Sequence, residues 1–259
     1  MFLERIVKTK REEIDRLNFS SVEEKKAREM PPCRSLRAAI SGDLPILIAE
    51  IKPASPSKGQ IRRNVDPLSL ALQYERGGAS AISVLTDVQY FGGRLSSLKE
   101  VKEAVSIPVL RKDFILDPLQ IIESRLYGAD AILIIAALHS PQKLKELTAF
   151  AQELGLEVLM EVHREEEVIP ALEAAPDVLG INNRDLHTFV TDIQVTEKLL
   201  PLIPKSTLVI SESGIHSPSD LQRVIAAGAK GALVGEYLMR QSSPEQGVRS
   251  LLAGVEELL

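Results

Sequence analysis

Two charged residues, Glu50 and Lys52, stand two positions apart at the end of the apolar run 46–51. Because side chains of a β-strand alternate between its two faces, both groups would leave the backbone on the same side. Charges at the end of a buried strand cost free energy unless they are paired or used. The pattern indicates either an ion pair where a strand leaves the core or two groups that act together on a substrate.

Polar and charged residues also follow most of the other apolar runs, whereas the interiors of these runs carry almost no charge. If the ends of the runs meet in space, this repetition favours a functional pocket over a series of solvated loop starts. The residues at these ends are Lys112, Asp113, Glu161, His163, Asn182, Asn183, Arg184, Asp185, Glu212, Ser213, Gly214, Gly235 and Glu236.

The predicted pocket combines three cations, Lys52, Lys112 and Arg184, with the carboxylates of Glu50 and Glu161. Such a mixture suits acid–base chemistry on an anionic substrate. Neighbouring positive charges lower the pKa of a lysine, whereas a neighbouring carboxylate keeps the lysine protonated as a proton donor.

Small residues follow the last two apolar runs, with Ser213 and Gly214 after one and Gly235 after the other. In barrels of parallel strands these positions commonly bind phosphate through backbone N–H groups at a helix N-terminus. We therefore expect a small phosphorylated substrate that undergoes proton transfers.

Eight short apolar runs recur along the chain, and continuous apolar runs are typical of strands buried on both faces of a parallel sheet. The spacers between them are predicted to be helices, since several open with a capping side chain before a proline, as in Asp66-Pro67 and Ser217-Pro218. The runs cover residues 46–51, 81–85, 107–110, 131–136, 158–162, 178–181, 208–210 and 232–234.

Eight strand–helix units predict an α/β fold, a single (β/α)8 TIM barrel over residues 46–259 whose site lies at the C-terminal ends of the strands. An open doubly wound sheet is the competing fold, but the sequence has neither a glycine-rich dinucleotide fingerprint nor a P-loop. Residues 1–45 show amphipathic helical patterns and no strand pattern, so we expect an N-terminal helical extension packed on the barrel.

The bulk composition is that of a globular protein, with 259 residues of which 44% are hydrophobic and 26% charged. A net charge of -5 gives no global attraction to nucleic acid, and no apolar run is long enough for a membrane span. The single cysteine and the lack of a signal-peptide pattern favour the cytoplasm. The four histidines have no metal-binding spacing, so we expect neither a metal nor a cofactor. We favour a monomer.

At the residues that follow its apolar runs, the sequence resembles the indole-3-glycerol-phosphate synthase family, and the resemblance covers almost the whole barrel. The residues 1–45 are similar to the extra helices of that family, which lie near the mouth of the barrel. No single short motif is specific for the family, but the combination of the matching motifs in this order is. The matching stretches are 50–59, 81–87, 90–93, 112–115, 161–162, 180–186, 211–215 and 233–235.

The resemblance implies a reaction of tryptophan biosynthesis, in which 1-(2-carboxyphenylamino)-1-deoxyribulose 5-phosphate closes its ring, loses CO₂ and water and gives indole-3-glycerol phosphate. It implies that Lys112 protonates the ketone oxygen, that Glu161 moves protons at the departing hydroxyl, and that Glu50 is a second acid–base group. The substrate-binding residues that it implies are Lys52 for an anionic end; Asn182 and Arg184 for hydroxyl and carboxylate groups; Ser213, Gly214, Gly235 and Ser55 for the phosphate; and Phe91, Phe114 and Leu133 for the ring.

Glu236 departs from part of that family, because some relatives carry a small hydroxyl residue there that can touch phosphate. A carboxylate pointed at a phosphate would repel it. We hypothesise that Glu236 turns outward and that only its backbone N–H contributes to phosphate binding.

Three other functions compete with this interpretation. Another phosphate-binding barrel, such as phosphoribosylanthranilate isomerase, would not need Glu50 and Lys52 together with Lys112. A Schiff-base aldolase would use Lys112 as a nucleophile, which borohydride trapping would detect. An inactive barrel that serves as a binding subunit is disfavoured by the complete set of candidate catalytic side chains.

Overall fold

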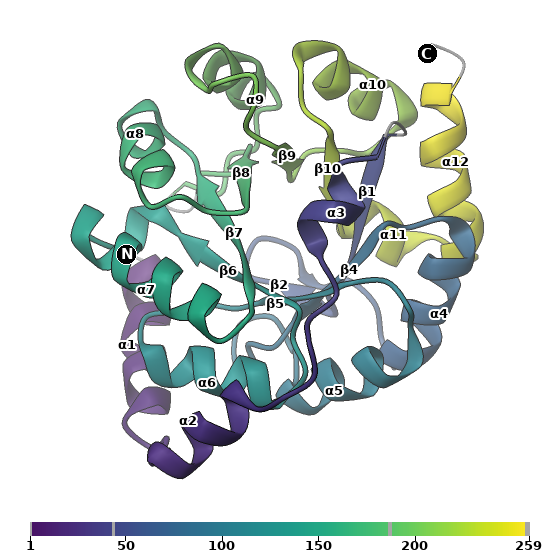
Figure 1. Cartoon of the computed structure of the whole chain (residues 1–259). Helices are drawn as coiled ribbons and strands as arrows, with labels where there is room; N and C mark the ends of the chain where they lie inside the picture. The colour runs from purple at the N-terminus through teal and green to yellow at the C-terminus, as the bar shows by residue number, and fades with distance from the viewer. Residues whose placement is uncertain (1, 43–44, 186–187, 257–259) are drawn as a thin grey trace.

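The computed structural model describes residues 2–42, 45–185 and 188–256, and its centre is a closed barrel of eight parallel strands (Figure 1). The fold class predicted from the sequence is confirmed. Neighbouring strands follow the chain order around the barrel, and β10 closes it by pairing with β1. The barrel strands are β1 (Ile46–Ile51), β4 (Ala81–Leu85), β5 (Val109–Lys112), β6 (Ala131–Ile135), β7 (Glu157–Val162), β8 (Val178–Asn182), β9 (Val209–Glu212) and β10 (Gly231–Val234).

Helices connect successive strands and cover the outside of the barrel (Figure 1). The predicted caps form: Asp66 and Ser217, for example, each accept a hydrogen bond from a backbone N–H in the first turn of their helix. The connecting elements are α4 (Pro67–Gly77), α5 (Leu95–Ala104), α6 (Pro118–Leu126), η1 (Ala136–Leu138), α7 (Pro141–Glu153), α8 (Glu165–Glu173), α9 (Gln194–Leu199), η2 (Leu200–Leu202) and α10 (Pro218–Ala227), followed by α11 (Glu236–Arg240) and α12 (Pro244–Glu256).

The strands divide the apolar core into two parts. One part fills the barrel and includes Ile48, Leu110, Leu159 and Ile210, while the other lies between the strands and the helices. Because strand side chains alternate, the residue two positions beyond each of these four also faces the interior. Those residues are Glu50, Lys112, Glu161 and Glu212, so the same alternation that builds the core brings charged groups to its C-terminal end.

One predicted strand lies two residues later than expected. The apolar pattern predicts residues 107–110, whereas β5 runs from Val109 to Lys112. Pro108 has no backbone N–H to donate to the ladder, which explains the later start. Lys112 is therefore the last residue of the strand, paired with Leu85 of β4, rather than part of a loop.

The N-terminal segment reaches both ends of the barrel. Helix α1 (Phe2–Ile14) lies at the mouth, where Lys10 contacts Asp87 and Asp113 just after β4 and β5. Helix α2 (Ser21–Arg28) packs near α6, and α3 (Leu36–Ile40) closes the opposite end. Helix α3 is held at the end opposite the mouth, because Ser35 and the Arg37 N–H both bond to Glu157, the first residue of β7.

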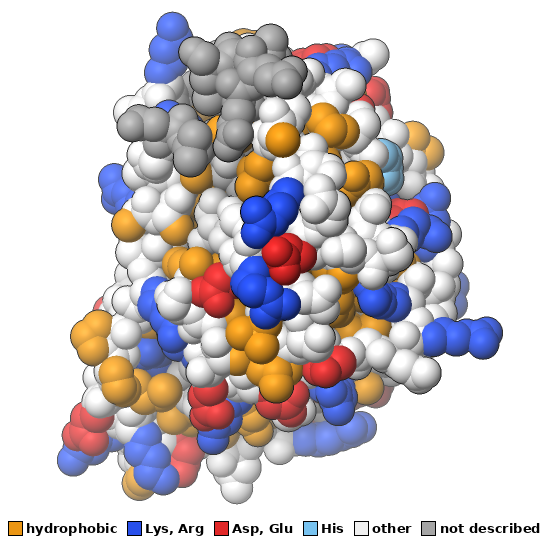
Figure 2. Space-filling view, turned by 90° about the vertical axis from the view of Figure 1, so that its right-hand side faces the viewer, with side chains coloured by type: hydrophobic (Ala, Val, Ile, Leu, Met, Phe, Trp, Pro, Cys, Tyr) orange, Lys and Arg blue, Asp and Glu red, His pale blue; other side chains and the backbone are white. Residues whose placement is uncertain are grey.

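The face that includes α4 and α12 mixes cationic and anionic side chains (Figure 2). Ion pairs such as Arg76 with Glu245 join these two helices. No helix in the described part of the chain is both long enough and apolar enough to cross a membrane.

Candidate active site

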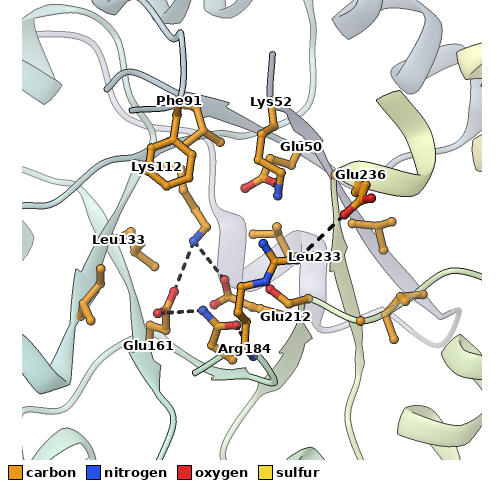
Figure 3. A pocket seen from close by; sticks show the side chains of 18 of the residues that line it. Glu50, Lys52, Phe91, Lys112, Leu133, Glu161, Arg184, Glu212, Leu233 and Glu236 are labelled. Carbon is orange, nitrogen blue, oxygen red and sulfur yellow. Dashed lines mark hydrogen bonds and ion pairs between the residues drawn. The ribbon is translucent and has the colours of Figure 1, made fainter. Parts of the chain in front are cut away.

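A cavity opens at the C-terminal ends of the barrel strands, as predicted, and it gathers most of the predicted site residues (Figure 3). Glu50 and Lys52 both line it, which confirms that they leave β1 on the same side. Ser55 has a predicted role and does not line the cavity, and the strand-end residues His163, Asn183 and Asp185 do not line it either. The predicted residues in its wall are Glu50, Lys52, Phe91, Lys112, Phe114, Leu133, Glu161, Asn182, Arg184, Ser213, Gly214 and Gly235.

Lys112 lies between two carboxylates in this cavity (Figure 3). Its Nζ is 3.2 Å from Glu161 Oε2 and 3.2 Å from Glu212 Oε2. The Asn182 amide donates to the other oxygen of Glu161 at 3.0 Å. Burial lowers the pKa of Lys112, but Glu212 and Glu161 outweigh burial and raise this pKa above its usual value. Lys112 is therefore an ammonium that can donate a proton into the cavity.

Glu212 is a site residue to which the sequence analysis gave no role. Its side chain is buried, and neither carboxylate oxygen accepts a hydrogen bond from the described residues, although Lys112 compensates its charge. Burial raises the pKa of Glu212 to about 7; Lys112 opposes this rise, and the Glu161 charge adds to it. Its position two residues beyond the interior-facing Ile210 was a signal that could have identified it.

Glu50 and Lys52 form a second charged group in the cavity wall, with Glu50 Oε2 and Lys52 Nζ 2.5 Å apart. Burial raises the pKa of Glu50, but the cations of Lys52 and Lys112 outweigh it and lower this pKa below its usual value. Glu50 is therefore an ionised carboxylate that can accept a proton. Gly235 faces this pair, and a Cβ there would overlap the Glu50 carboxylate.

Arg184 connects the end of β8 to the loop after β1. Its Nη1 donates to Ser57 Oγ at 2.9 Å and its Nε donates to Thr191 Oγ1 at 3.1 Å. Ser55, by contrast, is buried in the hairpin of β2 (Ala54–Ser55) and β3 (Gly59–Gln60), with no hydrogen-bond partner for its hydroxyl among the described residues. Ser57 and not Ser55 is thus the serine of this loop that bonds to a site residue.

The backbone after β9 forms a curved segment at the predicted phosphate position. Ser213 and Gly214 both have left-handed backbone conformations, with φ of 65° and 82°. Successive N–H groups in such turns can make anion-binding concavities. The Asn183 amide donates to the Ser213 carbonyl at 2.9 Å and holds this segment in place. Such a conformation costs free energy for a serine, and strain of this kind concentrates at functional sites.

The Glu236 carboxylate is surrounded by cations at the cavity rim. Arg240 Nη2 donates to it at 3.0 Å, and its oxygens lie 3.9 Å from both Lys58 and Arg184. Burial raises the pKa of Glu236, but Arg240 and Lys58 outweigh burial and lower it. Glu236 is therefore an anion whose charge is compensated from several sides, while it still lines the cavity.

Apolar side chains form the remaining wall. The rings of Phe91 and Phe114 have their centroids 6.0 Å apart, and Leu133 lies in the same cavity. The structure adds Leu85, Ile135, Phe189 and Leu233 to this lining. An aromatic ring of a substrate would find an apolar surface here beside the charged groups.

Lys10 is a second residue that the sequence analysis missed. Its Nζ lies 2.9 Å from Asp87 and 3.0 Å from Asp113. Asp87 accepts the Phe91 N–H at 3.1 Å, and Asp113 accepts the Phe114 N–H at 2.8 Å. Helix α1 thereby anchors the two segments that carry the aromatic wall.

Within the described ranges, no group of three or more His, Cys, Asp or Glu side chains could hold a metal ion. Of the four histidines, His216 lines the cavity, whereas His139 and His163 bond to backbone carbonyls. His187 lies outside the described residues.

Comparisons with known proteins identify relatives over nearly the full length. The sequence profile of the family described as Indole-3-glycerol phosphate synthase matches residues 3–251. The chain is 51% identical over 254 residues to the indole-3-glycerol phosphate synthase of Halalkalibacterium halodurans, with 97% of each chain covered. It is 49% identical over 251 residues to that of Geobacillus kaustophilus, with 96% of each covered.

More distant solved structures share only the fold. The 3-hexulose-6-phosphate synthase of Salmonella typhimurium has a TM-score of 0.66 at 15% identity, covering 82% of this chain and 99% of that one. The thiamine phosphate pyrophosphorylase of Pyrococcus furiosus has a TM-score of 0.64 at 16% identity, covering 87% and 100%.

Proposed function

The chain belongs to the indole-3-glycerol phosphate synthase family, and we propose that Lys112 is the general acid of the family's reaction in this protein. The protein is a carboxy-lyase of tryptophan biosynthesis. It converts 1-(2-carboxyphenylamino)-1-deoxyribulose 5-phosphate to indole-3-glycerol phosphate, with release of CO₂ and water.

The position of the Lys112 ammonium carries this proposal. It faces a cavity with an aromatic wall on one side and the curved Ser213–Gly214 backbone on the other. As the ring carbon that bears the carboxylate attacks the ketone carbon, Lys112 gives its proton to the ketone oxygen, which becomes a hydroxyl. The C–CO₂ bond then breaks, and its electron pair restores the aromatic ring. A positioned acid of this kind is typically worth ~10²–10⁴-fold in rate.

Glu161 and Glu50 are assigned to the dehydration that follows. After the C–CO₂ bond has broken, Glu161 takes up a proton from solvent and gives it to the new hydroxyl, which leaves as water. Glu50 accepts a proton from the adjacent carbon as the indole double bond forms. The Asn182 amide, which bonds to Glu161 Oε1, orients that group. The Lys52 ammonium keeps Glu50 ionised and available as the base.

Substrate binding is assigned to the remaining wall. Lys52 and Arg184 attract the substrate's anionic groups, and Asn182 bonds to its hydroxyls. The backbone at Ser213, Gly214 and Gly235 binds the phosphate, with the N–H of Glu236 as a further donor. The aromatic ring of the substrate occupies the apolar space between Phe91, Phe114 and Leu133. Ser55 lies away from the cavity wall, so its contribution to phosphate binding would require the first loop to move.

The test is turnover of the carboxyphenylamino substrate by purified protein without added metal, followed by indole fluorescence, with Lys112→Ala in parallel. We expect product from the wild type and a loss of at least ~10²-fold in the variant. Equal turnover by both would refute the role of Lys112 and leave the overall reaction in place. No product from a folded wild type would refute the reaction itself.

We also propose that the protein is a cytoplasmic monomer built as an N-terminal helical extension, residues 1–45, on a barrel of residues 46–259. The single cysteine and the acidic net charge support the compartment. Light scattering coupled to gel filtration tests the oligomeric state, and a mass near twice 28.4 kDa would refute the monomer.

A further inference from the structure

Gly180 occupies an inward-facing position in the middle of β8, directly beside the catalytic cavity. It pairs with Glu161 of β7 on one side and with Ile210 of β9 on the other. A Cβ on Gly180 would overlap Glu212 Oε1 and would lie 3.2 Å from Glu212 Cδ. The Glu212 carboxylate therefore occupies the space that a side chain at position 180 would fill.

The usual reasons for a glycine do not apply at this position. The backbone of Gly180 is not in the left-handed region, in contrast to that of Gly214. The atoms that a Cβ at Gly180 would meet first belong to the side chains of Glu212 and Leu159, and not to backbone. Gly231 is different, because a Cβ there would overlap the Ile46 carbonyl of the adjacent strand. The steric demand at Gly180 comes from a carboxylate that faces Lys112.

The consequence for the site follows from the barrel geometry. Glu212 lies on β9, and its carboxylate bends over Gly180 to come within 3.2 Å of the Lys112 Nζ on β5. If position 180 carried a methyl group, this carboxylate would have to move, and Lys112 would keep only Glu161 as a close partner. A displacement of about 1 Å at a reacting group can cost ~10²-fold in rate.

We propose that Gly180 is a positioning residue. Because Gly180 has no side chain, the Glu212 carboxylate fits above its Cα, contacts Lys112 and so directs the ammonium into the cavity. This inference rests on the proposed role of Lys112. It explains why a buried strand position tolerates a residue that contributes no core packing. It also gives Glu212 a defined function, as one of the two carboxyl groups that fix Lys112 in place.

A double-mutant cycle tests the proposal with Gly180→Ala, Glu212→Ala and the combined variant. We expect Gly180→Ala to lower kcat by about 10- to 100-fold with a smaller effect on KM, since the acid and not the binding groups is misplaced. Glu212→Ala removes the side chain that a methyl group would displace. Adding Gly180→Ala to Glu212→Ala should therefore cause no further loss of kcat.

Unfolding in urea supplies a readout that is independent of turnover. If the methyl group clashes with Glu212, Gly180→Ala should lower the urea midpoint in the wild-type background and not in the Glu212→Ala background. Should Gly180→Ala alone fail to fold, the proposal requires that the combined variant folds. Additive losses in both kcat and the urea midpoint would overturn it, as would wild-type kcat in Gly180→Ala.

The same measurements separate this inference from the proposed function. If Lys112→Ala kept full turnover, the role of the acid would fail, yet the stability cycle would still report whether Glu212 occupies the space at Gly180. If Lys112→Ala lost turnover while the cycle was additive, the acid would stand and the positioning role of Gly180 would be refuted.

Discussion

Lys10 and Lys112 are two buried lysines that both pair with carboxylates but have different roles in the protein. The Lys10 ammonium lies about 3 Å from three carboxylates, those of Glu13, Asp87 and Asp113. The Lys112 ammonium lies about 3 Å from two, those of Glu161 and Glu212. Burial lowers the pKa of both lysines, and the carboxylates outweigh it and raise both. The difference is access, since the Lys10 side chain is 2% exposed and the Lys112 side chain is 14% exposed to the cavity.

The partners of the two lysines also differ in how well they are satisfied. Asp113 accepts further hydrogen bonds from Thr86 and from the Phe114 N–H, whereas neither Glu212 oxygen accepts one from the described residues. Asp87 Oδ2 also has no hydrogen-bond partner among the described residues beyond its ion pair with Lys10, so access separates the clusters more than bonding does. A cluster closed to solvent holds structure in place, and a cluster with an open side is available to a substrate. The two lysines teach that the surroundings of a buried charge, more than the charge itself, separate anchoring from catalysis.

The largest expected effect is on turnover in Lys112→Ala. Loss of the proton donor should lower kcat by ~10²–10⁴-fold. The fold should persist, because burial already raises the pKa of Glu212, so this carboxylate can take up a proton when the ammonium is absent. Steady-state kinetics with circular dichroism on the same sample checks both parts, and turnover near that of the wild type would contradict the assignment.

Lys10→Met should act mainly on stability. It leaves Asp87 buried without the Lys10 cation and Asp113 with Arg111 alone, and breaking a buried pair in this way typically costs ~3–5 kcal/mol of unfolding free energy. Because Lys10 also anchors the segments of Phe91 and Phe114, KM should rise in the folded variant. The matched control is Lys8→Met, at an exposed position of the same helix. Equal urea midpoints for the two variants would show that Lys10 is no anchor.

The carboxyl groups around Lys112 and those around Lys10 should change the unfolding free energy in opposite directions as the pH rises. The pKa of Glu212 is raised to about 7 from the ordinary 4.5, so between these values the folded state holds a proton that the unfolded chain has lost. Unfolding free energy should therefore fall as pH rises from 4.5 to 7, by up to about 3 kcal/mol. Urea unfolding across this window should show a flatter dependence in Glu212→Gln, and an unchanged slope would refute the raised pKa.

At acid pH, Asp113 beside Lys10 should dominate the pH dependence of the unfolding free energy. The pKa of Asp113 is lowered to about 2 from 3.8; burial opposes this shift, and the cations of Arg111 and Lys10 outweigh burial. Its contribution to stability is complete above pH 3.8 and is lost as pH falls toward 2. Asp113→Asn should remove this part of the acid dependence in pH-jump unfolding. An acid transition identical to that of the wild type would argue against it.

The smallest effect is expected for an ion pair on the surface. Arg223 donates to Glu197 through two hydrogen bonds of 2.6 and 2.7 Å, but both side chains are in solvent. Water and salt screen such pairs, so Arg223→Ala should leave the urea midpoint within experimental error of the wild type. A shift as large as that of Lys10→Met would show that geometry rather than burial sets the strength of ion pairs in this protein.

The sequence by itself determined much of the architecture and of the site. Apolar runs and proline-preceded caps predicted the strands and helices, because alternation and capping act over a few residues. The same alternation predicted that Glu50 and Lys52 share one face. The resemblance pointed to Lys112 and Glu161, and both line the cavity.

Other features were decided only by the tertiary structure. Glu212 meets Lys112 over Gly180, Lys10 of the first helix reaches Asp113, and Ser57 rather than Ser55 bonds to Arg184. Each contact joins segments far apart in the chain, and none leaves a local pattern. Closure of the barrel and the register of its strands place these side chains together, and that register is a property of all eight strands at once.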